Sequence, residues 1–385
     1  MNNIVKTIGK FIFLKGVYPC QYKRHCRKPI KQGKAIFLEI RNETVGNSLK
    51  YLYRELNKKE GLKINCHFLH EESGKYWRTF INTMKFLKDM ATAQYVFLDE
   101  ANNTFACFDK REETKVVQVW HGCGAFKRFG LSTSELKFGS SKKQQQKYPL
   151  YHNLDLVTVS SPEVIWAYRE AMGVDEDTIQ AIGVSRTDVF YDDEYIAAAR
   201  QKVLSRIPNA DKKKTILYAP TFRGEVTKAK APDAMDLEYM GRTLGEDHIL
   251  LIKHHPFVKE VPEIPLSCSN FAYDVTKSFD IEDLLCASDI CITDYSSLIF
   301  EYSLFERPLI FFAYDLEGYN EWRGFYYDYD ELTPGPVVSD TEALVQSIND
   351  LEENFDSKEI RAFKDKFMSA CDGSATKRIL EYVGL

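Results

Sequence analysis

Short apolar runs, many of them rich in β-branched residues, alternate with longer helix-like segments along most of the chain. Runs of this length and composition predict β-strands. We predict strands at residues 35–40, 64–69, 95–98, 116–120, 156–159, 179–182, 215–218, 249–252, 290–293 and 309–312. Alternating strands and helices are typical of βαβ units around a mostly parallel sheet. We therefore expect an α/β fold of two Rossmann-type, doubly wound lobes that face a cleft.

The boundary between the two predicted lobes falls between residues 190 and 212. A charged helix-like stretch, residues 192–207, ends there in a polar segment before a new strand begins. A length of 385 residues fits two domains. The predicted division is a first lobe at 1–195, a second lobe at 210–365, and a C-terminal helix at 366–385 that can cross back to the first lobe.

Two segments are strongly basic, although the formal net charge is −5. Residues 1–38 hold nine Lys and Arg and no Asp or Glu. A helix predicted there has one apolar face, with Lys6 and Lys10 away from it; that face is made of Ile4, Val5, Ile8, Phe11 and Ile12. Such a helix either lies in an anionic lipid interface or packs on its own lobe. The second basic segment, 132–147, is predicted to be a loop, either a flap or plain surface.

Composition argues against several classes of protein. The chain is 44% hydrophobic and 28% charged, so we do not expect disorder. Its nine cysteines are scattered and include no C-x-x-C pair, which fits a reducing cytosol. No apolar run approaches the roughly 18–20 residues of a spanning helix, and no signal-peptide core is present. We expect a cytoplasmic, peripheral protein that binds an anionic membrane surface and no nucleic acid; homo-oligomerisation stays open.

Candidate chemistry lies where predicted strands end, which is where open α/β sheets bind their ligands. Strand 116–120 is followed by His121 and Gly122, and Lys127 comes shortly after. An imidazole at a strand tip can act as a general base, and a glycine lets the backbone approach a ligand closely. A histidine in this position can equally be structural.

The predicted strand 249–252 leads into Lys253, His254 and His255. A cation and two imidazoles suit a phosphate whose charge grows in a transition state. The alternative is a histidine pair that caps a turn before Pro256. Adjacent histidines diverge, and no carboxylate lies at ligand spacing, so we predict neither a metal nor a cofactor.

The predicted strand 290–293 is followed by Asp294, Ser296 and Ser297 and then by a helix-like segment. Free N–H groups in the first turn of a helix bind anions such as pyrophosphate. Helix capping alone would also explain Asp294.

Four further candidates follow other predicted strands: Thr221, Arg223, Arg186 and Arg323. The planar fork of arginine suits phosphate oxygens, although each arginine could instead bridge the lobes through a carboxylate. The chain has no Walker loop, G-x-S-x-G elbow or G-x-G-x-x-G fingerprint with its acidic partner. This argues against an ATPase, a hydrolase or a dehydrogenase.

Taken in order, these motifs resemble the CDP-glycerol glycerophosphotransferases of teichoic-acid and capsule synthesis. The resemblance covers about residues 95–330. It rests on Val119-Trp120-His121-Gly122 with Lys127 and Gly130, Gly183 with Arg186 and Asp188, residues 218–223, Lys253-His254-His255-Pro256, Asp294-Tyr295-Ser296-Ser297 with Phe300-Glu301, residues 308–315, and Arg323-Gly324-Phe325-Tyr326 with Asp328. Cys123-Gly124 departs from the family pattern, which puts the acceptor in doubt more than the chemistry.

The resemblance implies a GT-B-like fold whose first lobe serves the acceptor and whose second lobe binds a CDP-glycerol or CDP-ribitol donor. His121 then corresponds to the catalytic base and His255 to a required, phosphate-contacting histidine. The donor-binding set is Lys253, His254, Thr221, Arg223, Asp294, Ser296, Ser297 and Arg323, and the acceptor or phosphate contacts are Gly122, Lys127 and Arg186. The acceptor would be an undecaprenyl-linked saccharide at the inner face of the bacterial cell membrane.

In the mechanism expected from this resemblance, His121 deprotonates an acceptor hydroxyl, which attacks the distal phosphorus of the donor as CMP leaves. One alternative keeps the GT-B fold but uses a CMP- or UDP-activated sugar. A second alternative is a non-catalytic, nucleotide-binding membrane scaffold. Glycerol versus ribitol, and primase versus polymerase, stay open at this point.

Overall fold

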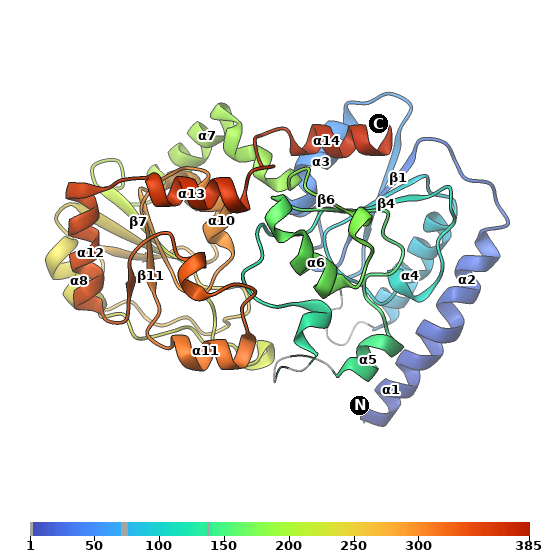
Figure 1. Cartoon of the computed structure of the whole chain (residues 1–385), viewed down its shortest axis with the longest axis horizontal. Helices are drawn as coiled ribbons and strands as arrows, with labels where there is room; N and C mark the ends of the chain where they lie inside the picture. Colours follow the sequence, from blue (N-terminus) through green and yellow to red (C-terminus); the bar gives the residue numbers. More distant parts are fainter. Residues whose placement is uncertain (1–2, 71–75, 135, 137–138, 140) are drawn as a thin grey trace. The chain divides into compact units, whose positions relative to one another are not determined.

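A computed structural model describes residues 3–70, 76–134, 136, 139 and 141–385 (Figure 1). The chain forms two compact units. The first unit comprises Met1–Gly122, Arg128–Asp188 and Ser369–Leu385, and the second comprises Cys123–Lys127 and Val189–Met368. The short segment Cys123–Lys127 therefore belongs with the second unit although the chain on both sides of it belongs to the first.

The first unit contains a six-stranded parallel sheet in the order β2-β1-β3-β4-β5-β6. Its strands are β1 (Lys34–Glu39), β2 (Lys63–Phe68), β3 (Tyr95–Leu98), β4 (Lys115–Gln118), β5 (Leu156–Thr158) and β6 (Ile179–Gln180). Its helices are α1 (Asn3–Ile12), α2 (Tyr18–His25), α3 (Asn47–Asn57), α4 (Tyr76–Met90), α5 (Lys142–Lys147), α6 (Ile165–Met172) and α14 (Ala375–Val383).

Alternate side chains of the central strands bury opposite faces of this sheet. Ile36 and Leu38 of β1 pack with residues of α2 and α4 on one face. Ala35 and Phe37 pack with residues of α3 and α14 on the other, and Figure 1 shows α14 beside α3. Both faces are covered, as parallel sheets require.

The second unit contains another six-stranded parallel sheet, in the order β12-β11-β10-β7-β8-β9. Its strands are β7 (Lys214–Tyr218), β8 (His248–Ile252), β9 (Ala272–Asp274), β10 (Ile290–Thr293), β11 (Leu309–Phe312) and β12 (Val337–Val338). Its helices are α7 (Asp193–Leu204), α8 (Leu237–Leu244), α9 (Ile281–Ala287), α10 (Leu298–Ser303), α11 (Leu316–Arg323), α12 (Thr341–Asn354) and α13 (Lys358–Phe367). Numbered within this unit, the order is 3-2-1-4-5-6, which is that of a Rossmann sheet.

The prediction of two doubly wound α/β lobes is confirmed. All ten predicted strands are present, with ends that differ by a few residues. Sequence reasoning missed β9 and β12, because three-residue and two-residue strands are too short to form a recognisable apolar run.

The segment predicted to be a loop at 132–147 is partly helical, so that prediction is wrong over α5. Lysine and glutamine, which compose this helix, are good helix formers, and Lys147 lies in its last turn where a cation is favourable. Residues 135, 137, 138 and 140 of the segment lie outside the described residues.

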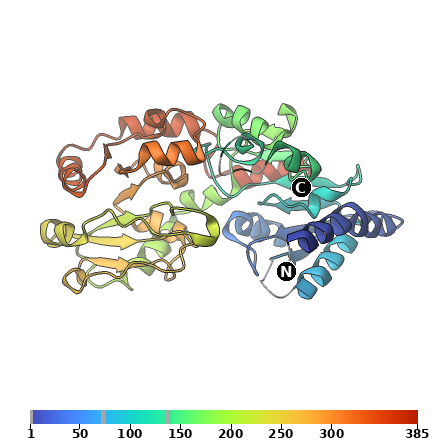
Figure 2. The same cartoon turned by 90° about the horizontal axis from the view of Figure 1, so that it is seen from below.

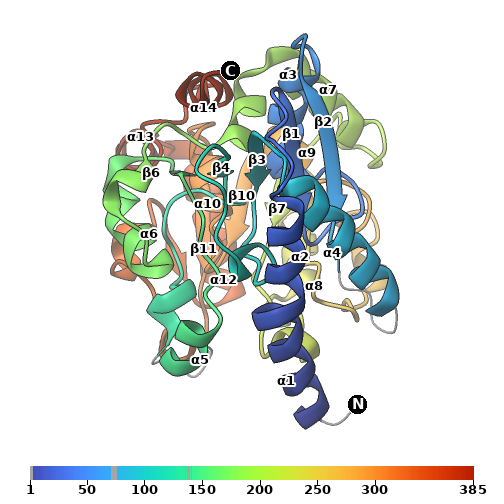
Figure 3. The same cartoon turned by 90° about the vertical axis from the view of Figure 1, so that its right-hand side faces the viewer.

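The predicted N-terminal helix is present as α1, which continues through a π-helical turn at Phe13–Val17 into α2. Figures 2 and 3 show α1 and α2 as a rod that runs beside α4. Among the described residues, no helix is both long and apolar enough to span a bilayer.

Candidate functional site

The first unit holds His121 just beyond β4. Trp120 precedes it with a left-handed backbone, φ +58°, and donates its N–H to Oε1 of Gln118 at 3.2 Å. A bulky residue rarely adopts this conformation, and here the indole is held by ring contacts with Phe129 and Tyr168. Strand β4 therefore ends abruptly, and the turn places His121 at the carboxyl edge of the sheet.

The hydrogen bonds of His121 define its tautomer. Its Nδ1 lies 3.0 Å from the carbonyl oxygen of Asp99, which can only accept, so Nδ1 carries the proton. Nε2 is then the basic nitrogen. Arg186 donates from Nη1 to the carbonyl oxygen of His121 at 2.6 Å and so fixes the backbone of the same residue.

Three buried carboxyl groups lie at the carboxyl ends of two neighbouring strands: Glu39 is the last residue of β1, and Asp99 and Glu100 follow β3. Oε1 of Glu100 lies 3.3 Å from Nδ1 of His121 and 2.7 Å from Nε of Arg41. β1 and β3 flank the point where the strand order of this sheet reverses, which is where α/β sheets form their ligand crevices.

The environment shifts the pKa values of these groups. The His121 side chain is 35% exposed, yet desolvation lowers its pKa to about 4. The hydrogen bond to the carbonyl oxygen of Asp99 raises this pKa, whereas the positive charges of Arg41 and Arg186 lower it. Burial raises the pKa of Glu100 to about 7, although the nearby Arg41 lowers it. Burial also raises the pKa of Asp99 to about 7. At neutral pH His121 is therefore an uncharged imidazole that can accept a proton.

In the second unit, Thr221, Arg223 and Asp294 form one hydrogen-bonded cluster. Asp294 is 1% exposed, and its Oδ1 accepts from the N–H of Thr221 at 2.8 Å and from the hydroxyl of Thr221 at 3.0 Å. Its Oδ2 lies 2.9 Å from Nη1 of Arg223. These residues follow β7 and β10, which flank the reversal of strand order in this sheet.

Arg223 is braced a second time by Asp315, which follows β11. Nε and Nη2 of Arg223 donate to the two oxygens of Asp315 at 2.6 and 2.9 Å, and the hydroxyl of Tyr295 donates to Asp315 at 2.9 Å. A bidentate pair of this kind fixes the guanidinium rigidly. Arg223 is thus the centre of a clamp between two carboxylates, and Asp294 is a member of that clamp rather than a helix cap.

Lys127 lies beside this clamp in the segment that joins the second unit. Its Nζ lies 3.4 Å from the hydroxyl of Tyr319, and its backbone pairs with Phe325 as an isolated bridge. Desolvation lowers the pKa of Lys127 to about 7; nearby Arg323 lowers it further, while Asp294 raises it. Two cationic side chains, those of Lys127 and Arg323, therefore lie close together next to the Arg223 clamp.

Of the three residues that follow β8, His255 has the most informative geometry. Its Nδ1 accepts the N–H of Phe257 at 3.2 Å, so the ring proton is on Nε2. The ring lies between Phe222 and Phe257, with centroids 4.9 and 4.6 Å away. An Nε2–H group held in this way is suited to donate to a phosphate oxygen.

Lys253 and His254 point to different surroundings. Nζ of Lys253 donates to the carbonyl oxygens of Thr276 and Phe279 at 2.8 and 2.6 Å, so this ammonium holds the loop after β9. His254 is 5% exposed and lines a separate pocket of the same unit. Neither side chain joins the cluster around Arg223.

The two predicted serines stand at the start of α10. The hydroxyl oxygen of Ser296 accepts the N–H of Leu298 at 3.4 Å, and Ser297 is the N-cap without a side-chain capping bond. Both are half-buried, so their hydroxyl groups are available at the carboxyl end of β10.

Sequence reasoning thus found the strand-end residues but missed their partners. No role was foreseen for Glu100, Asp99, Arg41, Asp315 or Tyr319. A signal existed for the acidic pair, because Asp99 and Glu100 directly follow the predicted strand 95–98. No pattern in the sequence indicated that Arg41 would reach Glu100 or that Asp315 would reach Arg223.

Comparison with known sequences identifies the relatives of this chain. The sequence pattern of the family CDP-glycerol:poly(glycerophosphate) glycerophosphotransferase matches residues 20–385. This chain belongs to that family. The glycerophosphotransferase resemblance seen in its strand-end motifs is thereby confirmed over nearly the whole chain.

Two relatives of this glycerophosphotransferase come from Bacillus spizizenii (strain ATCC 23059 / NRRL B-14472 / W23). Its teichoic acid ribitol-phosphate primase is 32% identical over 375 residues, which cover 96% of this chain and 96% of the primase. Its teichoic acid poly(ribitol-phosphate) polymerase is 34% identical over 357 residues, 92% of this chain. The match spans only 56% of that polymerase.

A solved structure of the wall teichoic acid polymerase TagF has the same fold as this glycerophosphotransferase. The TM-score is 0.78 at 24% identity, and the match covers 99% of this chain and 96% of the chain in that solved structure. The expected GT-B-like architecture of two Rossmann-type units is confirmed. The sugar-transferase and scaffold alternatives receive no support from these relatives.

Proposed function

We propose that this chain transfers glycerol phosphate or ribitol phosphate from a CDP-alditol to a hydroxyl group of a lipid-linked saccharide, with release of CMP. The observation that carries the proposal is the orientation of His121, whose Nδ1–H is fixed on a carbonyl oxygen so that Nε2 is a base. Membership of the glycerophosphotransferase family supports this reaction class.

In the proposed step the proton of the acceptor hydroxyl moves to Nε2 of His121. The oxygen forms a bond to the distal phosphorus of the donor, and the bond from that phosphorus to the CMP oxygen breaks. The negative charge leaves on CMP. Glu100, 3.3 Å from Nδ1, stabilises the imidazolium that forms at His121.

We assign the donor diphosphate to the second unit. Lys127 and Arg323 supply positive charge, and Nε2–H of His255 and the hydroxyl groups of Ser296 and Ser297 supply hydrogen bonds. Thr221 and Arg223 hold Asp294 and Asp315, so they act by keeping this surface rigid. Preorganised donors of this kind supply most of the catalysis in phosphoryl transfer.

The decisive test is His121→Ala, assayed for CMP release from CDP-glycerol and CDP-ribitol with a lipid-linked saccharide acceptor. Loss of a general base costs about 10²- to 10⁴-fold in kcat, while donor binding to the second unit should persist. His152→Ala is the matched control, because His152 is a 47% exposed histidine of the same unit that pairs with Asp109. Turnover of His121→Ala at the rate of the control would rule out the assigned base.

We further propose that the first unit binds an anionic membrane surface. Large apolar side chains are exposed on α1 and the following turn, namely Ile8 (54%), Phe11 (49%), Ile12 (52%) and Phe13 (38%), and on α4, namely Tyr76 (63%) and Trp77 (71%). Phe80 links the two sets through ring contacts with Phe13 and Trp77. We call the six exposed residues, which do not include Phe80, the N-terminal apolar patch.

Basic side chains border this patch. Nζ of Lys147 lies 5.2 Å from the centre of the Phe11 ring, and Lys10 and Lys147 both lie over the ring of Tyr148. Exposed aromatic groups with a lysine rim are the combination that binds the interface of an anionic bilayer. The exposure of Ile8, Phe11 and Ile12 favours lipid over the alternative that this helix face packs on its own lobe.

A further inference from the structure

The backbone of His121 is held from outside its own strand. Its carbonyl oxygen accepts a hydrogen bond from Nη1 of Arg186 at 2.6 Å. Arg186 belongs to the 3₁₀-helical segment Ser185–Tyr191, which follows β6. This bond fixes the backbone from which the imidazole projects. Whatever holds Arg186 in place therefore also affects the direction of the His121 ring.

The residues on both sides of Arg186 are bound to helix α14. The carboxylate of Asp188 accepts the N–H of Ala375 at 3.0 Å and the N–H of Thr376 at 2.7 Å. The hydroxyl of Ser185 lies 2.8 Å from the hydroxyl of Thr376. Asp188, Ser185 and Thr376 are each 3% exposed or less. A carboxylate that accepts two backbone N–H groups binds strongly, so this segment is fixed to the first turn of α14.

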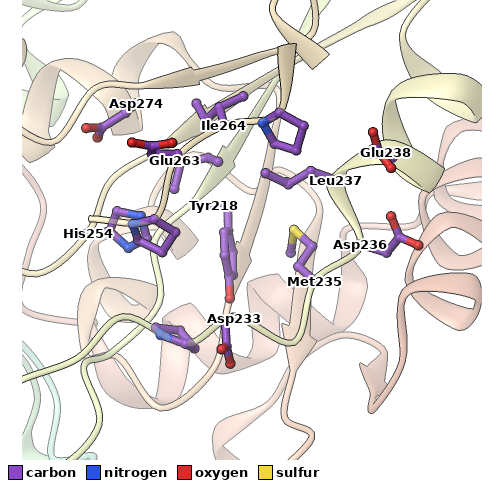
Figure 4. Close-up of a pocket in the computed structure, with 14 residues that line it drawn as sticks. Tyr218, Asp233, Met235, Asp236, Leu237, Glu238, His254, Glu263, Ile264 and Asp274 are labelled. Atoms are coloured by element: carbon purple, nitrogen blue, oxygen red, sulfur yellow. The ribbon is translucent and has the colours of Figure 1, made fainter. Parts of the chain in front are cut away.

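Asp188 takes the place of a local cap for α14. An aspartate often caps the helix that it directly precedes, as Asp236 does for α8 by accepting the N–H of Tyr239 at 2.9 Å (Figure 4). Ser374, which directly precedes α14, forms no side-chain capping bond with the described residues. The first turn of α14 is instead satisfied by a carboxylate that lies 187 residues before Ala375 in the chain.

Helix α14 is also anchored beside the strand that leads to His121. Ile379 and Leu380 of α14 belong to the same buried cluster as Val119, which lies two residues before His121. All of these residues are in the first unit. Contacts thus run from His121 through Arg186 to α14, and from α14 back to the end of β4. A side chain supported in this closed way is held in one orientation.

The turn after β6 is shaped for close contact with the C-terminal segment. Gly183 has φ +89°, and a Cβ atom there would lie 2.3 Å from the carbonyl oxygen of Ala370 and 2.7 Å from Cβ of Ala375. The carbonyl oxygen of Ile182 accepts Nε of Arg378 at 2.9 Å. Glycine is therefore required at this position for the turn to approach α14.

We propose that the C-terminal helix α14 positions the catalytic base through Asp188, which keeps Arg186 on the carbonyl oxygen of His121; the proposal rests on the proposed function. Asp188 is then a positioning residue that acts on the reaction only through Arg186. Loss of its carboxylate lets the segment of Arg186 shift, and the imidazole loses its fixed direction toward the acceptor hydroxyl. A displacement of about 1 Å can cost about 10²-fold in rate.

The first test measures kcat and the donor KM of Asp188→Ala by CMP release with a lipid-linked saccharide acceptor. We expect kcat to fall by about 10- to 100-fold. KM for the donor should stay within about twofold of wild type, because we assign the donor to the second unit. Asp192→Ala is the matched control, since Asp192 caps α7 by accepting the N–H of Tyr195 at 3.1 Å. Equal kcat values for the two variants would overturn the proposal.

A double-mutant cycle separates this role from general destabilisation. If Asp188 acts only through Arg186, the double variant Asp188→Ala with Arg186→Met should lose no more kcat than Arg186→Met alone. A loss equal to the product of the two single losses would show that the residues act independently, which contradicts the proposed connection.

A measurement on His121 itself does not depend on turnover. In protein labelled with ¹⁵N-histidine, the ring nitrogen shifts show which nitrogen carries the proton, and the His121 signals are identified by their loss in His121→Gln. The wild type should show the Nδ1–H form alone, because Nδ1 is held on the carbonyl oxygen of Asp99. Asp188→Ala should show a mixture of both tautomers. Unchanged His121 signals in this variant would refute the proposal.

Asp188→Asn replaces Asp188→Ala in these tests if the alanine variant does not fold. It keeps the shape of the side chain but places an amide donor opposite one of the two backbone N–H groups, so the same changes in kcat and in the His121 signals are expected. If the wild type releases no CMP from a CDP-alditol, the proposed function itself fails. The His121 signals then still decide whether α14 sets the orientation of the imidazole.

Discussion

At the scale of single residues, His121 and Glu100 form a coupled pair. The carbonyl of Asp99 keeps the proton on Nδ1 of His121, and Glu100 lies on the same side of the ring. Because the pKa of His121 is lowered to about 4, this imidazole is already neutral at any pH where the enzyme is normally assayed. The pH dependence of the step must then come from its neighbours.

Glu100 is the neighbour expected to titrate. Its pKa is raised to about 7 by burial, so it is charged above that pH and protonated below it. We predict that kcat rises with pH through about 7, because only charged Glu100 stabilises the imidazolium. In Glu100→Gln this pH dependence should disappear. We expect kcat of the variant to lie about tenfold below that of the wild type at high pH, which corresponds to a loss of about 1.4 kcal/mol of transition-state stabilisation.

The measurement is a pH profile of kcat at saturating donor for wild type and Glu100→Gln. KM for the donor should be similar in both proteins, because Glu100 belongs to the first unit. A wild-type profile that is flat from pH 6 to 8, or a variant that keeps the same rise, contradicts this role of Glu100.

Lys127 should take up a proton when the donor binds. Burial lowers its pKa to about 7, so at pH 8 most molecules carry a neutral amine. A nearby diphosphate favours the charged form and raises the pKa. Calorimetry of CDP-glycerol binding should therefore show proton uptake at pH 8, measured in HEPES and Tris buffers, and almost none at pH 5.5, measured in acetate and MES buffers.

Lys127→Met should abolish this uptake and weaken donor binding, whereas Lys358→Met, at an exposed position of α13, should change neither. Equal proton uptake by wild type and Lys127→Met would show that another group titrates.

The residues that carry these effects were only partly predictable from sequence. His121, Lys127 and His255 stand directly after strands or near them, so a strand-end rule finds them. Glu100, Arg41 and Asp315 take their importance from contacts between distant segments, such as the pair of Arg223 with Asp315. A single sequence contains no signal for such contacts.

At the scale of elements, Gly124 shows why the loop after β4 has its particular sequence. This glycine has φ +62°, and a Cβ atom there would lie 2.2 Å from the ring of Phe300. Phe300 is fully buried and stacks on Phe363, so it cannot move aside easily. Gly124 thus lets the segment Cys123–Lys127 pack closely on α10, which places Lys127 beside the Arg223 clamp.

We predict that Gly124→Ala lowers the melting temperature by about 5 °C or more, since a left-handed alanine costs about 1–2 kcal/mol and overpacking typically a further 1–3. Thermal denaturation followed by circular dichroism measures this. Gly318→Ala in α11, where a Cβ meets no atom within 4 Å, should be neutral or slightly stabilising. Equal melting temperatures for the two variants would contradict the packing argument.

The rod formed by α1 and α2 is the element assigned to the membrane. We predict that the wild type floats with vesicles containing phosphatidylglycerol and much less with pure phosphatidylcholine. The double substitution Phe11→Ser and Trp77→Ser should reduce flotation several-fold, because it removes apolar area from both parts of the N-terminal apolar patch. Tyr382→Ser, at a 50% exposed aromatic residue of α14, is the control. Unchanged flotation of the double variant would refute the assignment.

Element types were easier to predict than residue roles. Buried parallel strands such as β8 and β11 are continuous apolar runs, and α1 has a clear apolar face, so both could be recognised. The early end of β4 could not, because it depends on the left-handed Trp120, which rings of distant residues hold in place.

At the scale of the whole molecule, each unit repeats one design. Both sheets are parallel, and in each the polar clusters lie at the carboxyl ends of the strands where the strand order reverses: Glu39 and Glu100 in the first unit, Thr221 and Asp294 in the second. The two clusters differ in charge. The first is rich in carboxyl groups around a neutral imidazole, which suits proton removal, and the second brings Lys127 and Arg323 together, which suits a diphosphate.

This division of chemistry agrees with membership of the glycerophosphotransferase family, whose pattern covers residues from both units. The central claim is that this chain combines proton removal from an acceptor hydroxyl with binding of a donor diphosphate in one transfer reaction. The most direct measurement is mass spectrometry of a defined lipid-linked saccharide after incubation with the wild-type protein and CDP-glycerol, CDP-ribitol or a UDP-sugar. We predict that the acceptor gains the mass of one or more glycerol phosphate or ribitol phosphate units, with one CMP released for each. An acceptor that gains a sugar with release of UDP, or that gains no mass with any donor, would contradict the account.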